Sequence, residues 1–223
     1  MNLIRFNLLF LFVYRLCGMC LVTAGWCYPV ANAQNPPSLA PLDTSDRIGY
    51  FIAAGMAESQ FQAADRDLAT WALQAWERSS NGALRLEPDT ESSALLRVYW
   101  VPSSFGLYGE MQPLVVAGRR GAAVFIRPDT DAFGEQIAQR SREDPLFRDT
   151  VVYLTCLHEL GHALGLTHTS DFADVMYFFG FGGDISRFFG RYRDQLRSRN
   201  DIADVAGLSA GDLRQLGALY SLR

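Results

Sequence analysis

The chain has 223 residues, of which 49% are hydrophobic, and it carries 20 basic and 24 acidic side chains. A chain of this length and composition buries one substantial core, so we expect a single folded domain. All the basic residues are arginines, and their number does not exceed that of the acidic residues. The absence of a positive excess argues against nucleic acid as a partner.

The first 33 residues differ from the rest because they contain no acidic side chain and are strongly apolar. Arg5 and Arg15 precede an apolar run, and the segment ends in small residues up to Ala33. This pattern is typical of a secretory signal, and we expect cleavage between Ala33 and Gln34 to release a secreted or periplasmic protein. The alternative is an uncleaved membrane anchor, but Arg15 would lie near the middle of the span, where a charge is costly.

After a Pro-rich, polar lead-in at 34–46, strand and helix patterns alternate in a catalytic domain that would cover 47–223. A helix is expected after the first strand and up to Arg78, since apolar residues recur there at steps of three and four. A second helix should begin at Pro145, with Asp144 or Asp149 as its cap. Strand composition marks five segments: 47–53, 83–88, 95–101, 114–117 and 122–126.

The last two of these strands are separated by a short turn that contains glycine, so they should pair antiparallel. The order of strand, helix, strands and helix predicts a mixed α/β sandwich.

All three histidines fall within the eleven residues HELGHALGLTH. On a helix, His158 and His162 lie four residues apart and project from one face toward the same point. Gly165 can end the helix with a positive φ and turn the chain so that His168 approaches that point. Glu159 lies about a hundred degrees around the helix from His158, beside the ligands rather than among them. The pattern predicts three imidazole ligands and an adjacent carboxylate.

Zinc suits three neutral imidazoles best, because it accepts nitrogen ligands tetrahedrally and leaves a fourth position for water. We therefore predict one catalytic Zn²⁺ held by His158, His162 and His168. Glu159 would act as the general base that takes the proton of this water and passes it to the leaving amine of a peptide bond. A chance match to all five fixed positions has a probability on the order of 10⁻⁵ for a chain of this length.

These five positions match the signature HExxHxxGxxH of the metzincin clan of zinc endopeptidases, which the chain resembles. The clan also has a methionine turn beneath the metal, and Met176 follows the third histidine at the interval typical of the matrixin family. Tyr177 comes directly after Met176, as in matrixins, whereas Phe178 stands where astacins and serralysins carry a tyrosine that can ligate zinc. Taken alone, Met176 would more often be an ordinary core methionine.

The resemblance implies a metzincin-like α/β (α+β) fold: a twisted mixed sheet of about five strands with one antiparallel edge strand, an active-site helix and a C-terminal helix. Asp212 matches an aspartate that braces the methionine turn in matrixins, and its alternative role is to cap its own helix. The family geometry makes 114–117 the edge strand above the cleft, which would bind an extended peptide. An edge strand without a ligand is the alternative. Substrate contacts are then expected at Leu114, Val115, Val116 and Tyr177.

The metal content should differ from that of many matrixins. These commonly hold a second, structural zinc through histidines outside the signature, and this chain has no further histidine, so we expect one zinc. Asp129 and Asp131 are candidates for a Ca²⁺ site, although paired aspartates in a turn are more often solvated caps.

Latency should differ as well. The family restrains its enzymes with a propeptide cysteine, and we expect no such segment between Gln34 and the first strand. Cys156 cannot replace it, because two residues before His158 on a helix it faces away from the ligands as a buried core thiol. The enzyme would be made active or be restrained by a protein inhibitor.

The stretch 177–207 is longer than expected for a minimal matrixin and forms an insert after the methionine turn. Its aromatic and apolar residues fall on one helical face and its arginines form a basic remainder. Such a helix could pack on the domain with solvated arginines, dock on an anionic surface or bind an acidic partner. We expect it to shape or cover the specificity pocket. The residues concerned are Phe188, Phe189, Tyr192 and Leu196 on the apolar face, and Arg187, Arg191, Arg193, Arg197 and Arg199 on the basic one.

The sequence therefore predicts a zinc endopeptidase that acts on peptide or protein substrates. One alternative is a specialised peptide or cell-wall hydrolase of the same clan. The other is a non-catalytic binding or adhesion module. The presence of Glu159 argues against this alternative, because a structural zinc site needs no base and fills its fourth position with a protein ligand.

Overall fold

The computed structural model of the protein describes residues 40–106 and 108–220, which lie within one compact unit, 36–223. The predicted signal at 1–33, and the first part of the predicted lead-in, 34–39, lie outside the described residues. In the described part of the chain, none of the helices has the length and apolar character needed to cross a membrane.

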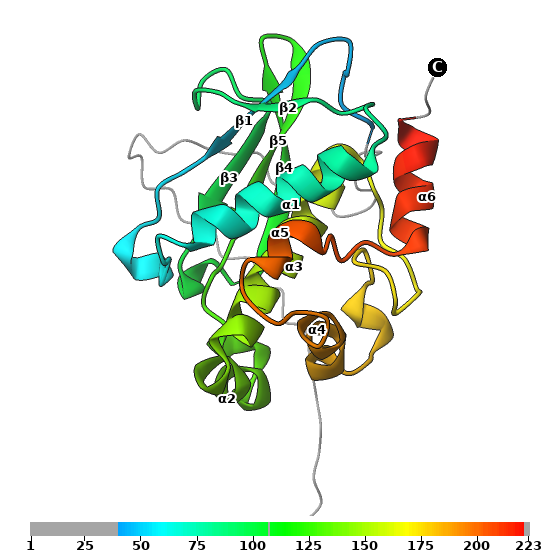
Figure 1. The fold of residues 1–223 in the computed structure, drawn as a ribbon. Helices are drawn as coiled ribbons and strands as arrows, with labels where there is room; N and C mark the ends of the chain where they lie inside the picture. The colour runs from blue at the N-terminus through cyan, green and yellow to red at the C-terminus, as the bar shows by residue number, and fades with distance from the viewer. Residues whose placement is uncertain (1–39, 107, 221–223) are drawn as a thin grey trace, which may run out of the picture. The chain divides into compact units, whose positions relative to one another are not determined.

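A five-stranded sheet, ordered β2-β1-β3-β5-β4, forms the centre of this unit (Figure 1). The first four strands in this order pair in parallel, and only β4 runs antiparallel to its neighbour. The predicted mixed sheet with one antiparallel edge strand is therefore confirmed. The strands are β1 (Ile48–Ile52), β2 (Leu86–Pro88), β3 (Leu96–Trp100), β4 (Gly109–Val116) and β5 (Arg119–Ile126).

The edge strand β4 begins five residues before the predicted start at Leu114, so the prediction of its extent was wrong. The part of the strand before Leu114 contains Gly109, Glu110 and Pro113, residue types that are depleted in strands, so the sequence pattern did not indicate a strand there. The turn to β5 has positive φ at Ala117 and Gly118, 48° and 80°. Positive φ at both central residues is the type I′ geometry that matches the twist of a hairpin.

Two helices, α1 (Asp65–Ser79) and α3 (Pro145–Leu164), pack against each other in the core. The indole Nε1 of Trp76 donates to the carbonyl of Leu157 at 2.9 Å, and a fully buried Asp65 accepts from Arg148 at 2.8 Å. The cap of α3 is Asp144, one of the two predicted candidates, which accepts from the first amides of the helix. These contacts fix the axis of α3, the helix that carries the histidine motif.

Two helical predictions need correction. The helix expected directly after the first strand starts only at Asp65, because a 3-10 turn (Ala57–Ser59) and a loop come first. The helix α2 (Glu135–Glu143) was not predicted, since its sequence EQIAQRSRE is polar and buries only Ile137, Ala138 and Ser141. The other 3-10 turns are Ser103–Phe105, Asp131–Phe133 and Phe179–Phe181.

The predicted insert forms α4 (Ile185–Arg193) and the single turn α5 (Asp201–Asp204), and α6 (Ala210–Leu219) follows. The helix α4 lies next to α2 at one end of the sheet and packs against α3 (Figure 1). Its predicted apolar face is buried, although Leu196 lies past the end of the helix. The packing interpretation of this segment is therefore confirmed.

Three of its arginines bind the rest of the domain instead of being solvated. Arg193 pairs with Asp144 at 2.7 Å, and Arg199 pairs with Asp149 at 3.0 Å. Arg191 donates to the carbonyl of Ala173 at 2.8 Å. These contacts anchor the C-terminal end of α4 and the segment that follows it.

Candidate metal centre

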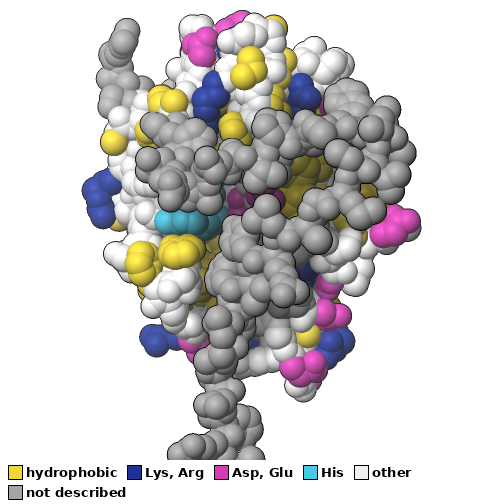
Figure 2. Space-filling model, turned by 180° about the vertical axis from the view of Figure 1, so that it is seen from behind, with side chains coloured by type: hydrophobic (Ala, Val, Ile, Leu, Met, Phe, Trp, Pro, Cys, Tyr) yellow, Lys and Arg dark blue, Asp and Glu magenta, His cyan; other side chains and the backbone are white. Residues whose placement is uncertain are grey.

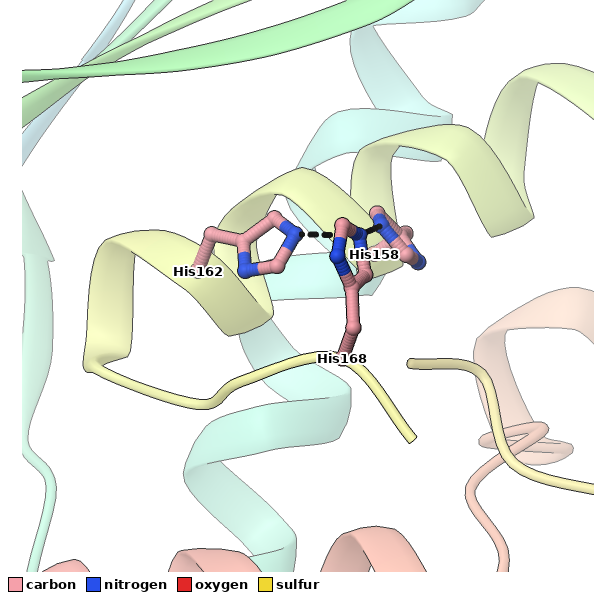
Figure 3. Close-up of side chains that lie close together, drawn as sticks. All are labelled: His158, His162 and His168. Atoms are coloured by element: carbon pink, nitrogen blue, oxygen red, sulfur yellow. Dashed lines mark hydrogen bonds between the residues drawn. The ribbon is translucent and has the colours of Figure 1, made fainter. Parts of the chain in front are cut away.

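The three histidines converge on one point from two segments (Figure 3). His158 and His162 lie on the last turns of α3, which ends at Gly165 with a φ of 104°. That left-handed residue turns the chain back, as predicted, and brings His168 to within 3.2 Å of His158 and 3.1 Å of His162, measured between Nε2 atoms. Within the described residues, this is the one group of side chains found with metal-ligand spacing.

Backbone carbonyls orient two of the rings. Nδ1 of His158 lies 2.7 Å from the carbonyl oxygen of Val175, and Nδ1 of His162 lies 2.9 Å from that of Leu166. Because a carbonyl oxygen only accepts, both rings must carry their proton on Nδ1, which leaves the Nε2 lone pairs directed at the common point.

This donor set fits zinc. Tetrahedral bonds of about 2.05 Å would hold two nitrogen ligands about 3.3 Å apart, close to the two distances between Nε2 atoms. Burial and the neighbouring His162 lower the pKa of His158 to about 3 and that of His168 to about 4. The imidazoles are therefore neutral at physiological pH, and three lone pairs that face one another need a cation between them.

Glu159 occupies the position expected of a base. It follows His158 on α3, is 8% exposed and lines the same cavity as the histidines. Burial, and then the charge of Glu110, raise its pKa to about 8. A cation held by the histidines would favour its carboxylate form.

Gly109 at the start of β4 makes room for this carboxylate. A Cβ atom at Gly109 would lie 2.5 Å from Cγ and 2.6 Å from Oε1 of Glu159. Only a glycine therefore lets the edge strand come this close to the helix.

The predicted methionine turn lies beneath the histidines. Met176 is fully buried, and its Sδ would lie 2.4 Å from a Cβ at Gly161, the residue that precedes His162. Asp212 on α6 accepts from the amides of Val175 at 2.9 Å and Met176 at 3.3 Å. The same aspartate completes the capping box of α6 with Ser209, so it caps its helix as well, although as a fully buried side chain and not as a solvated one.

An apolar cavity of about 500 Å³ opens beside the histidines. Segments far apart in the sequence supply its walls, among them Tyr108, Phe133, Leu154, Val175, Phe179, Phe188 and Phe189. The ring of Phe178 lies 4.9 Å from that of His168, and Figure 2 shows hydrophobic side chains next to the histidines on this face. The insert therefore forms part of the pocket, as expected.

The predicted substrate contacts divide into two groups. Tyr177 lines the cavity and donates to the carbonyl of Gly182 at 2.9 Å. Leu114, Val115 and Val116 belong to the edge strand, but they lie near its hairpin end and do not line the cavity. The part of the strand that does so is 109–111, which the sequence interpretation missed because it placed the start of the strand too late.

Two further predictions concern residues away from the histidines. Cys156 is fully buried and burial raises the pKa of its thiol, as expected for a core residue. In the loop considered for calcium, Asp129 accepts from the amide of Asp131, whose own carboxylate pairs with Arg142 at 3.3 Å. These contacts are those of a turn cap and a surface ion pair, and a Ca²⁺ ion at this loop stays a prediction.

Comparison with known families matches residues 44–182 to the matrixin family. The matched part covers more than half of the chain and includes the histidines, Glu159 and the methionine turn, so the chain belongs to the matrixins, a family of zinc metallopeptidases. The helices α4, α5 and α6 follow the matched residues. No curated protein matches the chain.

Proposed function

We propose that this protein is a zinc-dependent endopeptidase in which His158, His162 and His168 hold the metal and Glu159 is the general base. The observation that carries the proposal is the convergence of three neutral Nε2 atoms beside a buried carboxylate, at the mouth of a cavity. A structural zinc site would fill its fourth position with a protein ligand, and the cluster of ligand atoms found in the described residues has three members.

In the proposed reaction, the metal and the side chains of the cleft have separate chemical roles. When bound, zinc lowers the pKa of a coordinated water and polarises the scissile carbonyl. Glu159 accepts a proton from the attacking water as the new C–O bond forms, and delivers it to the amine nitrogen as the C–N bond breaks. The carbonyls of Val175 and Leu166 hold the two helical imidazoles in the ligating tautomer.

The substrate would bind as an extended peptide along the free edge of β4. One side of this strand pairs with β5, and the other side is the edge of the sheet. Residues 109–111 pass next to Glu159 and line the cavity. Main-chain hydrogen bonds to this edge would give affinity, and one substrate side chain would enter the aromatic pocket.

Replacement of Glu159 by alanine tests the role of the base. We expect Glu159→Ala to bind zinc as wild type does and to lose proteolysis by about 10³-fold or more, measured by metal analysis and by cleavage of an unfolded protein. Glu143→Ala on α2 is the matched control. Cleavage by Glu159→Ala at the wild-type rate would remove Glu159 from the mechanism.

We also propose that the protein is exported and that residues 1–33 are removed. The acid-free, apolar character of this segment and its small-residue end support the proposal. N-terminal sequencing of the secreted protein should begin at Gln34, and a chain retained at full length in the membrane would contradict export.

A further inference from the structure

The cleft contains one charge that the proposed reaction does not use. Glu110 and Glu159 are the acidic residues found among the described residues that line the cavity, and none of these lining residues is an arginine. Glu159 has its role as the base. Glu110 lies on β4, directly after the glycine that contacts Glu159.

The side chain of Glu110 is available to a ligand. Gly109 faces the helix, and because side chains alternate along a strand, Glu110 points to the opposite face. Glu110 is half-buried, and its Oε1 accepts from the amide group of Gln112 at 3.0 Å. The ion pairs formed within 40–106 and 108–220 do not include it. Its carboxylate therefore has a neutral partner and no neutralising cation.

We propose that Glu110 is a specificity-determining residue, which makes the cleft prefer peptides with a basic side chain at the position that pairs with it across the strand edge. The inference rests on the proposed endopeptidase function and on binding of the substrate along β4. A peptide added to this edge alternates its side chains as β4 does, so every second one lies on the face of Glu110. Opposite charges in such cross-strand pairs attract, and like charges repel.

The size of the effect follows from the strength of such pairs. A single cross-strand ion pair changes an equilibrium by about two- to fivefold relative to a neutral pair. Exchange of lysine for glutamate in the substrate replaces attraction by repulsion, so we expect a preference of about tenfold at one position.

A set of peptides with one scissile bond tests the proposal. Lysine, glutamine or glutamate is placed in turn at each of the three positions on either side of the bond, and kcat/KM is measured. Wild type should prefer lysine over glutamate by about tenfold at one position. Glu110→Gln should reduce this preference to about twofold or less, and Glu110→Arg should invert it. The preference should also weaken at high salt.

The exposed Glu58 on another segment provides the control. Glu58→Gln should keep the wild-type preference, since its charge lies outside the cleft-lining residues. Loss of the preference in both variants would assign it to net charge rather than to Glu110, and its persistence in Glu110→Gln would overturn the proposal.

A binding measurement separates this inference from the proposed activity. The same peptides are titrated into zinc-loaded Glu159→Ala protein, with and without Glu110→Gln, and their dissociation constants are compared. A preference for lysine that depends on Glu110 supports the inference, even if wild type cleaves none of the peptides. Equal affinities for the lysine and glutamate peptides would overturn it, even if the enzyme is an active endopeptidase.

Discussion

At the residue scale, two glycines without a side chain leave the space that neighbouring side chains at the metal centre occupy. Gly109 gives room to Glu159, and Gly161 gives room to the sulfur of Met176. Neither has a positive φ in the described backbone, so the requirement is for close approach and not for an unusual conformation. Close packing around the histidines therefore requires glycine at Gly109 and Gly161, although neither residue is a candidate metal ligand.

The substitution Gly109→Ala tests this close approach. The added Cβ would overlap the Glu159 side chain, so either the carboxylate or the edge strand must shift by about an ångström, and a displacement of this size costs about 10²-fold in rate. We expect kcat/KM to fall by about that factor, while zinc content remains that of wild type.

Gly217→Ala is the control for that experiment, because a Cβ at Gly217 meets nothing within 4 Å. This variant should cleave at the wild-type rate, and as an alanine within α6 it should be slightly more stable. Full activity of Gly109→Ala would show that the contact with Glu159 is not needed for catalysis.

At the element scale, the methionine turn joins the two helices that frame the site. The carbonyl of Val175 accepts a hydrogen bond from His158 on α3. The amides of Val175 and Met176 donate to Asp212 on α6. The carboxylate of Asp212 is fully buried. A change in α6 should therefore reach the metal ligand through the turn.

Asp212→Ala should reveal this connection. The substitution leaves the amides of Val175, Met176 and Ser209 without their carboxylate partner, and a buried unsatisfied donor costs about 1–3 kcal/mol. We expect the free energy of unfolding to fall by about 3 kcal/mol in urea titrations. The zinc affinity, measured by competition with a chelator, should fall about tenfold or more because the support of His158 is weakened.

The exposed Asp204 on α5 offers a matched control. Asp204→Ala should change the stability by less than about 0.5 kcal/mol, as surface substitutions usually do. If Asp212→Ala lost stability but bound zinc with unchanged affinity, the turn would not transmit the effect to the ligands.

Both the aromatic face and the arginines of the helix α4 pack against the rest of the domain. Its aromatic face closes one side of the pocket with Phe188 and Phe189. The sequence pattern allowed its arginines to bind an external partner. In the structure, Arg191 lies 4.5 Å above the ring of Phe188 and donates to the loop before the methionine turn. The basic residues of the insert thus help to fix the pocket wall.

At the scale of the whole molecule, the metal should contribute to stability. Three ligands from α3 and the loop after it face one another, and a ligand that binds only the folded state stabilises it by about 2.7 kcal/mol at a hundredfold excess over its Kd. Zinc removal should lower Tm by about 5–10 °C, as measured by thermal unfolding with and without a chelator.

Two variants define the control for that measurement. Glu159→Ala should keep the full metal-dependent shift, because Glu159 is not a ligand in the proposed site. His168→Ala should lose most of it, since a ligand is missing. An identical Tm for wild type with and without zinc would contradict a metal centre that stabilises the fold.

The sequence by itself determined the features that depend on neighbours along the chain. The spacing of His158 and His162 on one helix, the left-handed turn at Gly165 and the cap at Asp144 are local, so residue types and intervals suffice to predict them. The five strands and the helix α3 follow from hydrophobic patterns, and the mixed sheet follows from their order.

Only the tertiary structure decided which distant residues meet at the metal centre. The approach of Gly109 to Glu159, the carbonyl of Val175 on His158 and the aromatic walls of the pocket join segments that no periodicity relates. The polar first half of β4 and the polar helix α2 were missed for the same reason, because packing against neighbours overrides their weak local propensity. Long-range contacts therefore set the shape of the cleft, whereas the local pattern set its chemistry.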